Sequence, residues 1–138
     1  MTVTFVVRFP VDDAVLNDLH GRAFGSSGPV VPWRARLERH ALTWVGAFAA
    51  SRLIGFVQVG WDGGSHAFLL DTAVDPAFQG NGIGAALVKA AVDEARAAGC
   101  TWAHVDFEPR LEDFYLRRCG FRPTAAGLIA LDAENVRG

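Results

Sequence analysis

The sequence predicts a single α/β domain over residues 1–138, with a mixed, mostly antiparallel sheet of six to seven strands and helices on both faces. Apolar runs of strand length follow one another closely in the first half, which favours antiparallel neighbours. The second half alternates strand and helix patterns, which favours a β-α-β crossover and a parallel pair. The expected order is therefore β-α-α-β-β-β-α-β-α-β, an α+β arrangement around one sheet.

The first three elements lie before residue 41. Residues 3–9 are apolar and β-branched, which predicts the first strand. A helix is expected to begin at Asp12 or Asp13, because an aspartate caps a helix well and apolar residues follow at helical spacing. After a loop of small polar residues, residues 32–40 predict a short helix with proline in its first turn.

Three strands are expected next. Residues 43–50 and 53–61 predict two of them, joined over the hairpin-length dipeptide Ser51-Arg52. Residues 68–74 are almost continuously apolar, as expected of a central strand that is covered on both faces. Asp71 is the exception within that strand.

The remaining elements alternate. An apolar stripe predicts a helix over residues 83–98, and residues 102–107 predict a strand. Residues 111–118 predict a short helix, and a last strand is expected to begin at residue 121 and continue through residues 128–131. Residues 134–138 form a polar tail.

Composition excludes several classes of protein. The hydrophobic fraction of 51% predicts a globular chain, and a net charge of −2 argues against a nucleic-acid binder held by a basic field. The apolar runs are far shorter than a membrane span, and the N-terminus lacks the pattern of a signal peptide. Two cysteines cannot form a disulfide framework. A cytoplasmic protein that does not bind membranes is therefore expected.

A glycine-rich loop over residues 74–84 joins a predicted strand to a predicted helix. Its glycines, Gly80, Gly82 and Gly84, allow positive φ angles and close approach of a ligand to the main chain. A helix N-terminus offers unpaired amides and a partial positive charge, which suits a phosphate. Because residues 74–88 contain no lysine or arginine, main-chain amides are expected to hold that phosphate.

The sequence resembles the GCN5-related N-acetyltransferases (GNAT superfamily). The family's central signature corresponds to Gln79-Gly80-Asn81-Gly82-Ile83-Gly84, preceded by a matching lead-in, Ala73-Val74-Asp75-Pro76. The family's tyrosine-to-Gly-Phe ending corresponds to residues 114–121, Phe-Tyr-Leu-Arg-Arg-Cys-Gly-Phe. The resemblance covers the whole chain and is most specific from residue 69 to residue 121.

By that resemblance the sheet is splayed open between its fourth and fifth strands, and acetyl-CoA or another acyl-CoA lies in the gap. Tyr115 lies on the helix whose counterpart faces the thioester sulfur, which implies a role as general acid. Many members carry an asparagine seven residues before the tyrosine, whereas this chain has Glu108 there, followed by Pro109. The residues implied to bind the pyrophosphate and the pantetheine arm are Ala73, Val74, Gln79, Gly80, Asn81, Gly82, Ile83, Gly84 and Ala85.

Two other interpretations of the loop remain. Residues 80–85 match the dinucleotide pattern G-x-G-x-x-A, and Asp106 lies about 20 residues further on, where such folds place a ribose-binding acid. Two features weigh against a dinucleotide site. Residues 75–79 separate the strand from the first glycine, which follows the strand closely in that motif, and the chain after Asp106 is too short for a second βαβ half. The second interpretation is a turn without a ligand, although three alternating glycines exceed what a turn requires.

Transfer of an acyl group to an amine requires a neutral amine, a polarised carbonyl and a proton for the leaving thiolate. Tyr115 is the candidate acid, although its helical spacing alone favours a packing role. Asp71 is the first candidate for a base or an amine-binding acid, because a carboxylate in an apolar strand needs a partner or a function. The alternative for Asp71 is a structural acid bonded to neighbouring main chain.

Trp33, Asp106 and Glu108 are candidates for acceptor binding. Trp33 is suited to stack on a substrate cation, or else packs within its short helix. Asp106 and Glu108 either form an acidic pocket together with Asp71 or lie at a solvated strand end. The four histidines lack metal-binding spacing, so no metal is expected.

The sequence therefore predicts an acyl-CoA-dependent N-acetyltransferase that moves an acetyl group from acetyl-CoA to a primary amine by direct attack in a ternary complex. The alternative is a non-catalytic acyl-CoA-binding sensor or interaction module of the same fold. A small-molecule or peptide amine is the expected acceptor, and the resemblance is compatible with a homodimer.

Overall fold

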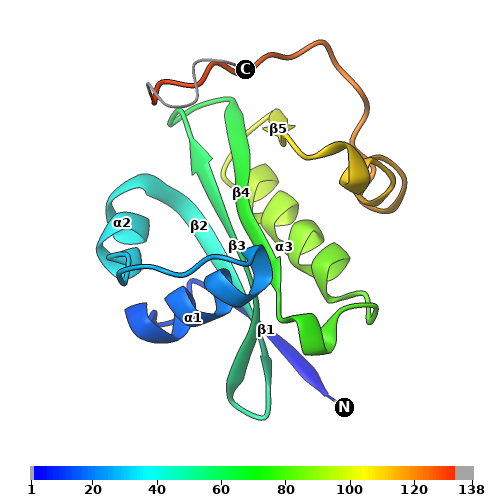
Figure 1. Cartoon of the computed structure of the whole chain (residues 1–138). Coiled ribbons are helices and arrows are strands. Elements are labelled where there is room, and N and C mark those ends of the chain that lie inside the picture. The colour runs from blue at the N-terminus through cyan, green and yellow to red at the C-terminus, as the bar shows by residue number, and fades with distance from the viewer. Residues whose placement is uncertain (1, 133–138) are drawn as a thin grey trace.

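The computed structural model describes residues 2–132 and contains one mixed sheet with helices against both of its faces (Figure 1). The described helices are α1 (Asp13–Phe24), α2 (Trp33–His40) and α3 (Ile83–Ala97). The described strands are β1 (Val3–Val7), β2 (Ala41–Ala49), β3 (Arg52–Trp61), β4 (His66–Val74) and β5 (Trp102–His104). The expected α/β architecture with a mixed, mostly antiparallel sheet is confirmed.

The strands lie in the order β1-β2-β3-β4-β5, and only the β4–β5 pair is parallel. Helices α1 and α2 cover one face of the sheet, and α3 covers the other (Figure 1). Each face therefore has its own apolar core, built around Phe56 and Leu16 on the α1 side and around Val57 and Leu87 on the α3 side.

Local signals explain where α1 begins and ends. The Asp12 side chain accepts a hydrogen bond from the Val15 amide at 3.1 Å, which satisfies one of the free N–H groups of the first turn. Gly25 ends the helix in a left-handed conformation, with φ of 68°. Its buried residues, Leu16 and Leu19, face the sheet.

The β2–β3 hairpin differs by one residue from the expected turn. Ala49 pairs with Arg52, so the two turn residues are Ala50 and Ser51, not Ser51 and Arg52. Both have positive φ angles, 47° and 70°, as a tight hairpin turn of this length requires. Neither is an asparagine or a glycine, which is why the sequence pattern placed the turn less accurately.

Strands β4 and β5 pair over only three residues, from His66 opposite Trp102 to Phe68 opposite His104. Because β4 continues to Val74, its second half has an edge that β5 does not cover. Phe68 and Leu70 are 41% and 43% exposed, so the expectation that this strand is covered on both faces is wrong. The register places their side chains on the same face of the sheet as that of Gln58, and on this face both remain partly open to solvent.

The expectation of six to seven strands is also wrong, since residues 2–132 form five. The strand expected from residue 121 to residue 131 is absent. In place of the α-helix expected over residues 111–118, a 3-10 turn (Pro109–Leu111) is followed by a π-helix (Asp113–Arg118). A strand in the last segment would follow β5 in the chain, and β5 offers only three residues to pair with. Three aliphatic side chains of this last segment are 83–90% exposed: Leu128, Ile129 and Leu131. The predicted polar tail lies outside the described residues.

Candidate functional site

The N-terminus of α3 presents main-chain amides that the helix itself does not use. The first main-chain hydrogen bond into the helix runs from the Ala86 amide to the Gly82 carbonyl, at 3.1 Å. The amides of Ile83, Gly84 and Ala85 precede it, and no side chain caps this end of the helix. Together with the helix dipole, these amides form an anion-binding end of the kind that holds phosphate.

Two glycines of the loop have the positive φ angles that the sequence predicts, and the third has a different role. Gly80 and Gly82 have φ of 83° and 76°, in the left-handed region where other residues are strained. Gly84 is helical, but a Cβ atom there would lie 3.2 Å from the Phe114 ring. Gly84 therefore lets the helix start pack closely against the segment that carries Tyr115.

The polar side chains of the loop bond back to its own main chain. The Asn81 amide group donates to the Phe78 carbonyl at 3.0 Å, and the Gln79 amide group donates to the Val74 carbonyl at 3.4 Å. Both side chains are exposed and stabilise the loop's shape from outside. This agrees with a loop that binds an anion through its main-chain amides, and a contact of Gln79 or Asn81 with a cofactor stays a prediction.

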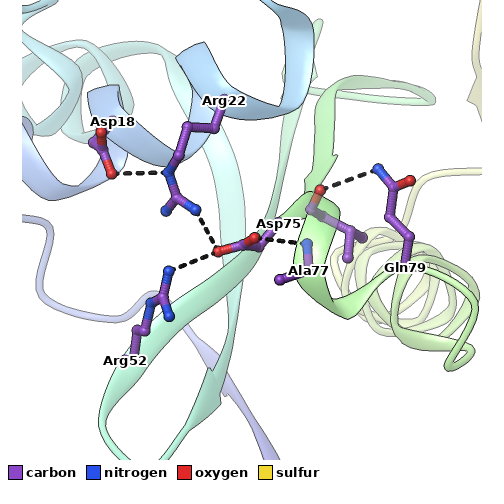
Figure 2. A network of polar contacts seen from close by, with 7 residues as sticks. Asp18, Arg22, Arg52, Asp75, Ala77 and Gln79 are labelled. Carbon is purple, nitrogen blue, oxygen red and sulfur yellow. Dashed lines mark hydrogen bonds and ion pairs between the residues drawn. The ribbon is translucent and has the colours of Figure 1, made fainter.

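A buried carboxylate anchors the first residues of the loop (Figure 2). Asp75 is 1% exposed, and its side chain accepts hydrogen bonds from Arg22, from Arg52 at 3.0 Å and from the Ala77 amide at 2.9 Å. Burial alone would raise the pKa of Asp75, but the Ala77 amide and the two guanidinium groups outweigh it and hold the pKa below its usual value. Asp75 thereby ties the entrance of the loop to α1 and to β3.

A β-bulge interrupts β4 beside this anchor. Phe56 pairs with Ala73 and Gln58 with Leu70, so Asp71 and Thr72 together lie opposite one residue of β3. Asp71 has φ of 59°, which is uncommon for a residue other than glycine. The extra residue shifts the alternation of side chains along β4, so that Asp71 turns toward α1 and Thr72 toward the other face.

Thr72 reaches Tyr115, which is 7% exposed and lies in the π-helix. Burial raises the pKa of the Tyr115 phenol, a hydrogen bond with Thr72 opposes the rise, and nearby Cys119 and Asp106 add to it. The phenol therefore stays protonated at neutral pH and has a proton to donate. Three aromatic rings surround it at centroid distances of 4.8–6.0 Å: Phe107, Phe114 and Phe121.

Asp71 reaches the opposite face of the sheet. One carboxylate oxygen lies 2.9 Å from His20 Nε2, and the other accepts a hydrogen bond from Gln58 Nε2 at 2.7 Å. The carboxylate is therefore paired with side chains, not with main chain, and it remains 31% exposed. Asp71 and Tyr115 thus approach the uncovered edge of β4 from its two faces.

The candidates for acceptor binding differ in position. Trp33 is 3% exposed, donates its indole N–H to Asn17 Oδ1 at 3.1 Å and contacts the His20 ring, so it offers almost no surface for stacking. Asp106 is exposed and lies near enough to Tyr115 to raise its pKa. Glu108 is exposed and pairs with Arg110 at 2.9 Å.

Two surface hollows lie away from this region. One of about 320 Å³ lies against Trp44, and another of about 310 Å³ lies against Leu116. Neither is lined by β4 or by the glycine loop. The candidate site is the open edge of β4 between the α3 N-terminus and Tyr115.

Comparison with known proteins agrees with this arrangement. A sequence model of the acetyltransferase (GNAT) family matches residues 14–121. The chain belongs to this family. Serotonin N-acetyltransferase 2 of Oryza sativa is 28% identical over 93% of this chain and 61% of its own length. The chain thus spans less than two thirds of this curated relative.

Solved structures show the same GNAT fold at low sequence identity. A Trypanosoma brucei acetyltransferase has a TM-score of 0.80 and 21% identity, covering 95% of this chain and 99% of its own. A predicted acetyltransferase of Clostridium acetobutylicum, solved with acetyl-CoA, has a TM-score of 0.74 and 15% identity, covering 94% of this chain and 96% of its own. These likenesses establish the fold and not the substrate.

Several residues of this GNAT site escaped the sequence analysis. His20, Gln58 and Thr72 contact the predicted residues Asp71 and Tyr115, and Arg22 and Arg52 hold Asp75. His20 and Arg22 lie more than 50 positions before their partners, so no motif spacing connects them. Among the described residues, no group of three or more potential metal ligands is present, and no helix is long and apolar enough to cross a membrane.

Proposed function

We propose that this GNAT protein is an acyl-CoA-dependent N-acetyltransferase that moves an acetyl group from acetyl-CoA to a primary amine by direct attack in a ternary complex. The observation that carries the proposal is the pairing of two features on one open strand edge. The uncapped N-terminus of α3 lies at one end, and the buried, protonated Tyr115 faces the same strand. The first feature suits a pyrophosphate and the second suits a leaving thiolate.

The residues present fit an acyl-CoA. The amides of residues 83–85 and the left-handed glycines would hold the pyrophosphate. The edge of β4 up to Ala73 and Val74 would pair with the amide groups of the pantetheine arm, because β5 leaves that edge uncovered. Acetyl-CoA supplies the activated acetyl thioester when it is bound.

Tyr115 would protonate the leaving thiolate. Its raised pKa keeps the phenol protonated, and the surrounding aromatic rings exclude water from the proton transfer. A hydrogen bond with Thr72 lowers the pKa of the phenol and so opposes part of the rise that burial causes. A general acid placed in this way contributes about 10²–10⁴-fold to a rate.

The acceptor is proposed to be a small-molecule or peptide amine, with no role for nucleic acid or membrane. The face of β4 beyond α1 exposes Phe68 and Leu70, which favours an acceptor with an apolar body. Because one relative is named a serotonin N-acetyltransferase, arylalkylamines belong in the first acceptor panel. Polyamines, aminoglycosides and peptide N-termini complete that panel.

Two measurements test the proposal. Titration calorimetry with acetyl-CoA is expected to show saturable binding, and a thiol-release assay over the panel is expected to show acetylation of at least one amine. Absence of binding would refute the site. Full binding without transfer to any amine would instead favour an acyl-CoA-binding sensor of the same fold.

A further inference from the structure

His20 and Asp71 form a histidine–carboxylate pair at the mouth of the uncovered β4 edge. His20 Nε2 lies 2.9 Å from Asp71 Oδ1, and the pair joins α1 to the bulge of β4. About a quarter of the His20 side chain, 24%, is exposed. The pair is thus neither sealed in the core nor fully solvated.

Asp71 is itself held in place. Gln58, which is 8% exposed on β3, donates to the second carboxylate oxygen at 2.7 Å. The positive φ of Asp71 and the bulge around it turn the carboxylate toward α1, away from the regular course of the strand. The structure maintains a strained backbone here, which is typical of functional positions.

The histidine ring is also held in place. It packs between Phe24 at 4.5 Å and Trp33 at 5.0 Å, measured between ring centroids. Trp33 is fixed in turn by its hydrogen bond to Asn17. Two aromatic contacts and one ionic hydrogen bond leave the ring little rotational freedom.

The partner of Nε2 determines the protonation pattern of the ring. A carboxylate accepts hydrogen bonds, so Nε2 carries the hydrogen of the neutral imidazole. The lone pair then lies on Nδ1, the nitrogen that takes up a proton. A carboxylate behind the ring stabilises the imidazolium that results, as in a catalytic triad.

We infer that His20 is the general base that removes a proton from the acceptor amine, with Asp71 and Gln58 as positioning residues. The inference rests on the proposed N-acetyltransferase function. The amine gives one proton to His20 Nδ1, its nitrogen forms a bond to the acetyl carbon, and the carbon–sulfur bond breaks. Tyr115 gives its phenolic proton to the leaving thiolate and regains a proton from the acetylated nitrogen, which thereby loses its second proton, and His20 returns the first proton to solvent after turnover.

The test compares wild type with His20→Gln on two acceptors of the same shape. One is the best amine of the panel. The other is the matching hydrazine, in which an NH group replaces the CH2 group that bears the amino group, as in phenylhydrazine for benzylamine. The alkylamine is mostly protonated at neutral pH and needs a base, whereas the hydrazine is already neutral. His20→Gln should lower kcat on the amine about 100-fold, lower kcat on the hydrazine less than about tenfold, and leave acetyl-CoA affinity within about twofold.

His40→Gln is the matched control, since His40 is an exposed histidine at the end of α2, and it should retain wild-type kcat. Asp71→Asn removes the carboxylate behind the histidine without changing the imidazole ring. It should also lower kcat on the amine more than on the hydrazine. Added imidazole should restore part of the activity of His20→Ala.

Equal losses on both acceptors, or unchanged kcat in His20→Gln, would overturn the role of His20 while the proposed function stands. Inactivity of the wild type on every amine would overturn the proposed function itself. If His20→Gln does not fold, the amine and the hydrazine are compared in Asp71→Asn, and equal losses of kcat on the two acceptors would overturn the role of His20.

Discussion

Replacing Asp75 with asparagine should destabilise the fold far more than the same change at an exposed aspartate. Asp75 is buried and accepts hydrogen bonds from two guanidinium groups and one amide. Asparagine keeps one acceptor oxygen for the Ala77 amide but turns an N–H group toward Arg22 and Arg52. Two charge-assisted hydrogen bonds are lost, at about 1.5–3 kcal/mol each.

Both arginines keep part of their side chains in water, 36% for Arg22 and 58% for Arg52, so they regain solvation and reduce that loss. The expected fall in the free energy of unfolding is therefore about 3 kcal/mol. Asp93→Asn is the matched control, because Asp93 also pairs with two cations, Lys89 and Arg96, but on the surface of α3. Its unfolding free energy should stay within experimental error of wild type.

Urea denaturation at neutral pH and near pH 3 gives both values. The pKa of Asp75 is lowered from 3.8 in the folded state, so its contribution is present above that pH and is lost as the pH falls through the folded pKa. The difference between wild type and Asp75→Asn should therefore shrink on acidification. Equal effects at Asp75 and Asp93, or a difference that grows in acid, would refute the buried anchor.

Three further predictions concern the cradle, the acid and the C-terminal segment. Tyr115→Phe should lower kcat about 100-fold with acetyl-CoA affinity unchanged, and an equal kcat would remove its acid role. Gly82→Val should raise the Kd for acetyl-CoA at least about tenfold, since a left-handed conformation costs about 1–2 kcal/mol for a residue with a side chain. Gln79→Ala should raise the same Kd less than about threefold. A larger effect of Gln79→Ala than of Gly82→Val in calorimetry would contradict binding through the main chain. Replacing the exposed residues Leu128, Ile129 and Leu131 together with serine should change the monomer's free energy of unfolding by less than about 0.5 kcal/mol. A loss of stability, or the loss of a dimer in size-exclusion chromatography, would show that a second copy covers these side chains.

The parts of the site that the sequence predicted are contiguous in the chain. The strand into Val74, the glycine loop and the start of α3 depend on neighbours within about ten residues, so local pattern specifies them. Tyr115 was located because the family's ending is equally local. The expected strand at residues 121–131 failed for the opposite reason, because strand formation needs a partner edge and the three-residue β5 does not provide one.

The partners of the catalytic candidates could not be predicted in this way. Asp71 stood out as a carboxylate in an apolar strand, but whether it bonds main chain, substrate or another side chain depends on the bulge and on the placement of α1. His20 has no local signal, since its significance comes only from a contact 51 positions away. Trp33 was predicted for stacking, yet the packing of α1 against α2 buries it behind His20.

Two contacts join α1 to the far end of β4, and they depend on each other. His20 meets Asp71, and Arg22, two residues later on the same helix, meets the buried Asp75. The anchor at Asp75 costs desolvation that its partners outweigh, whereas the His20–Asp71 pair stays partly exposed to solvent. A rigid contact thus fixes the helix, and the helix then fixes the histidine against the bulge. The same anchor sets the entrance of the glycine loop, so one buried carboxylate aligns the proposed phosphate cradle with the proposed base.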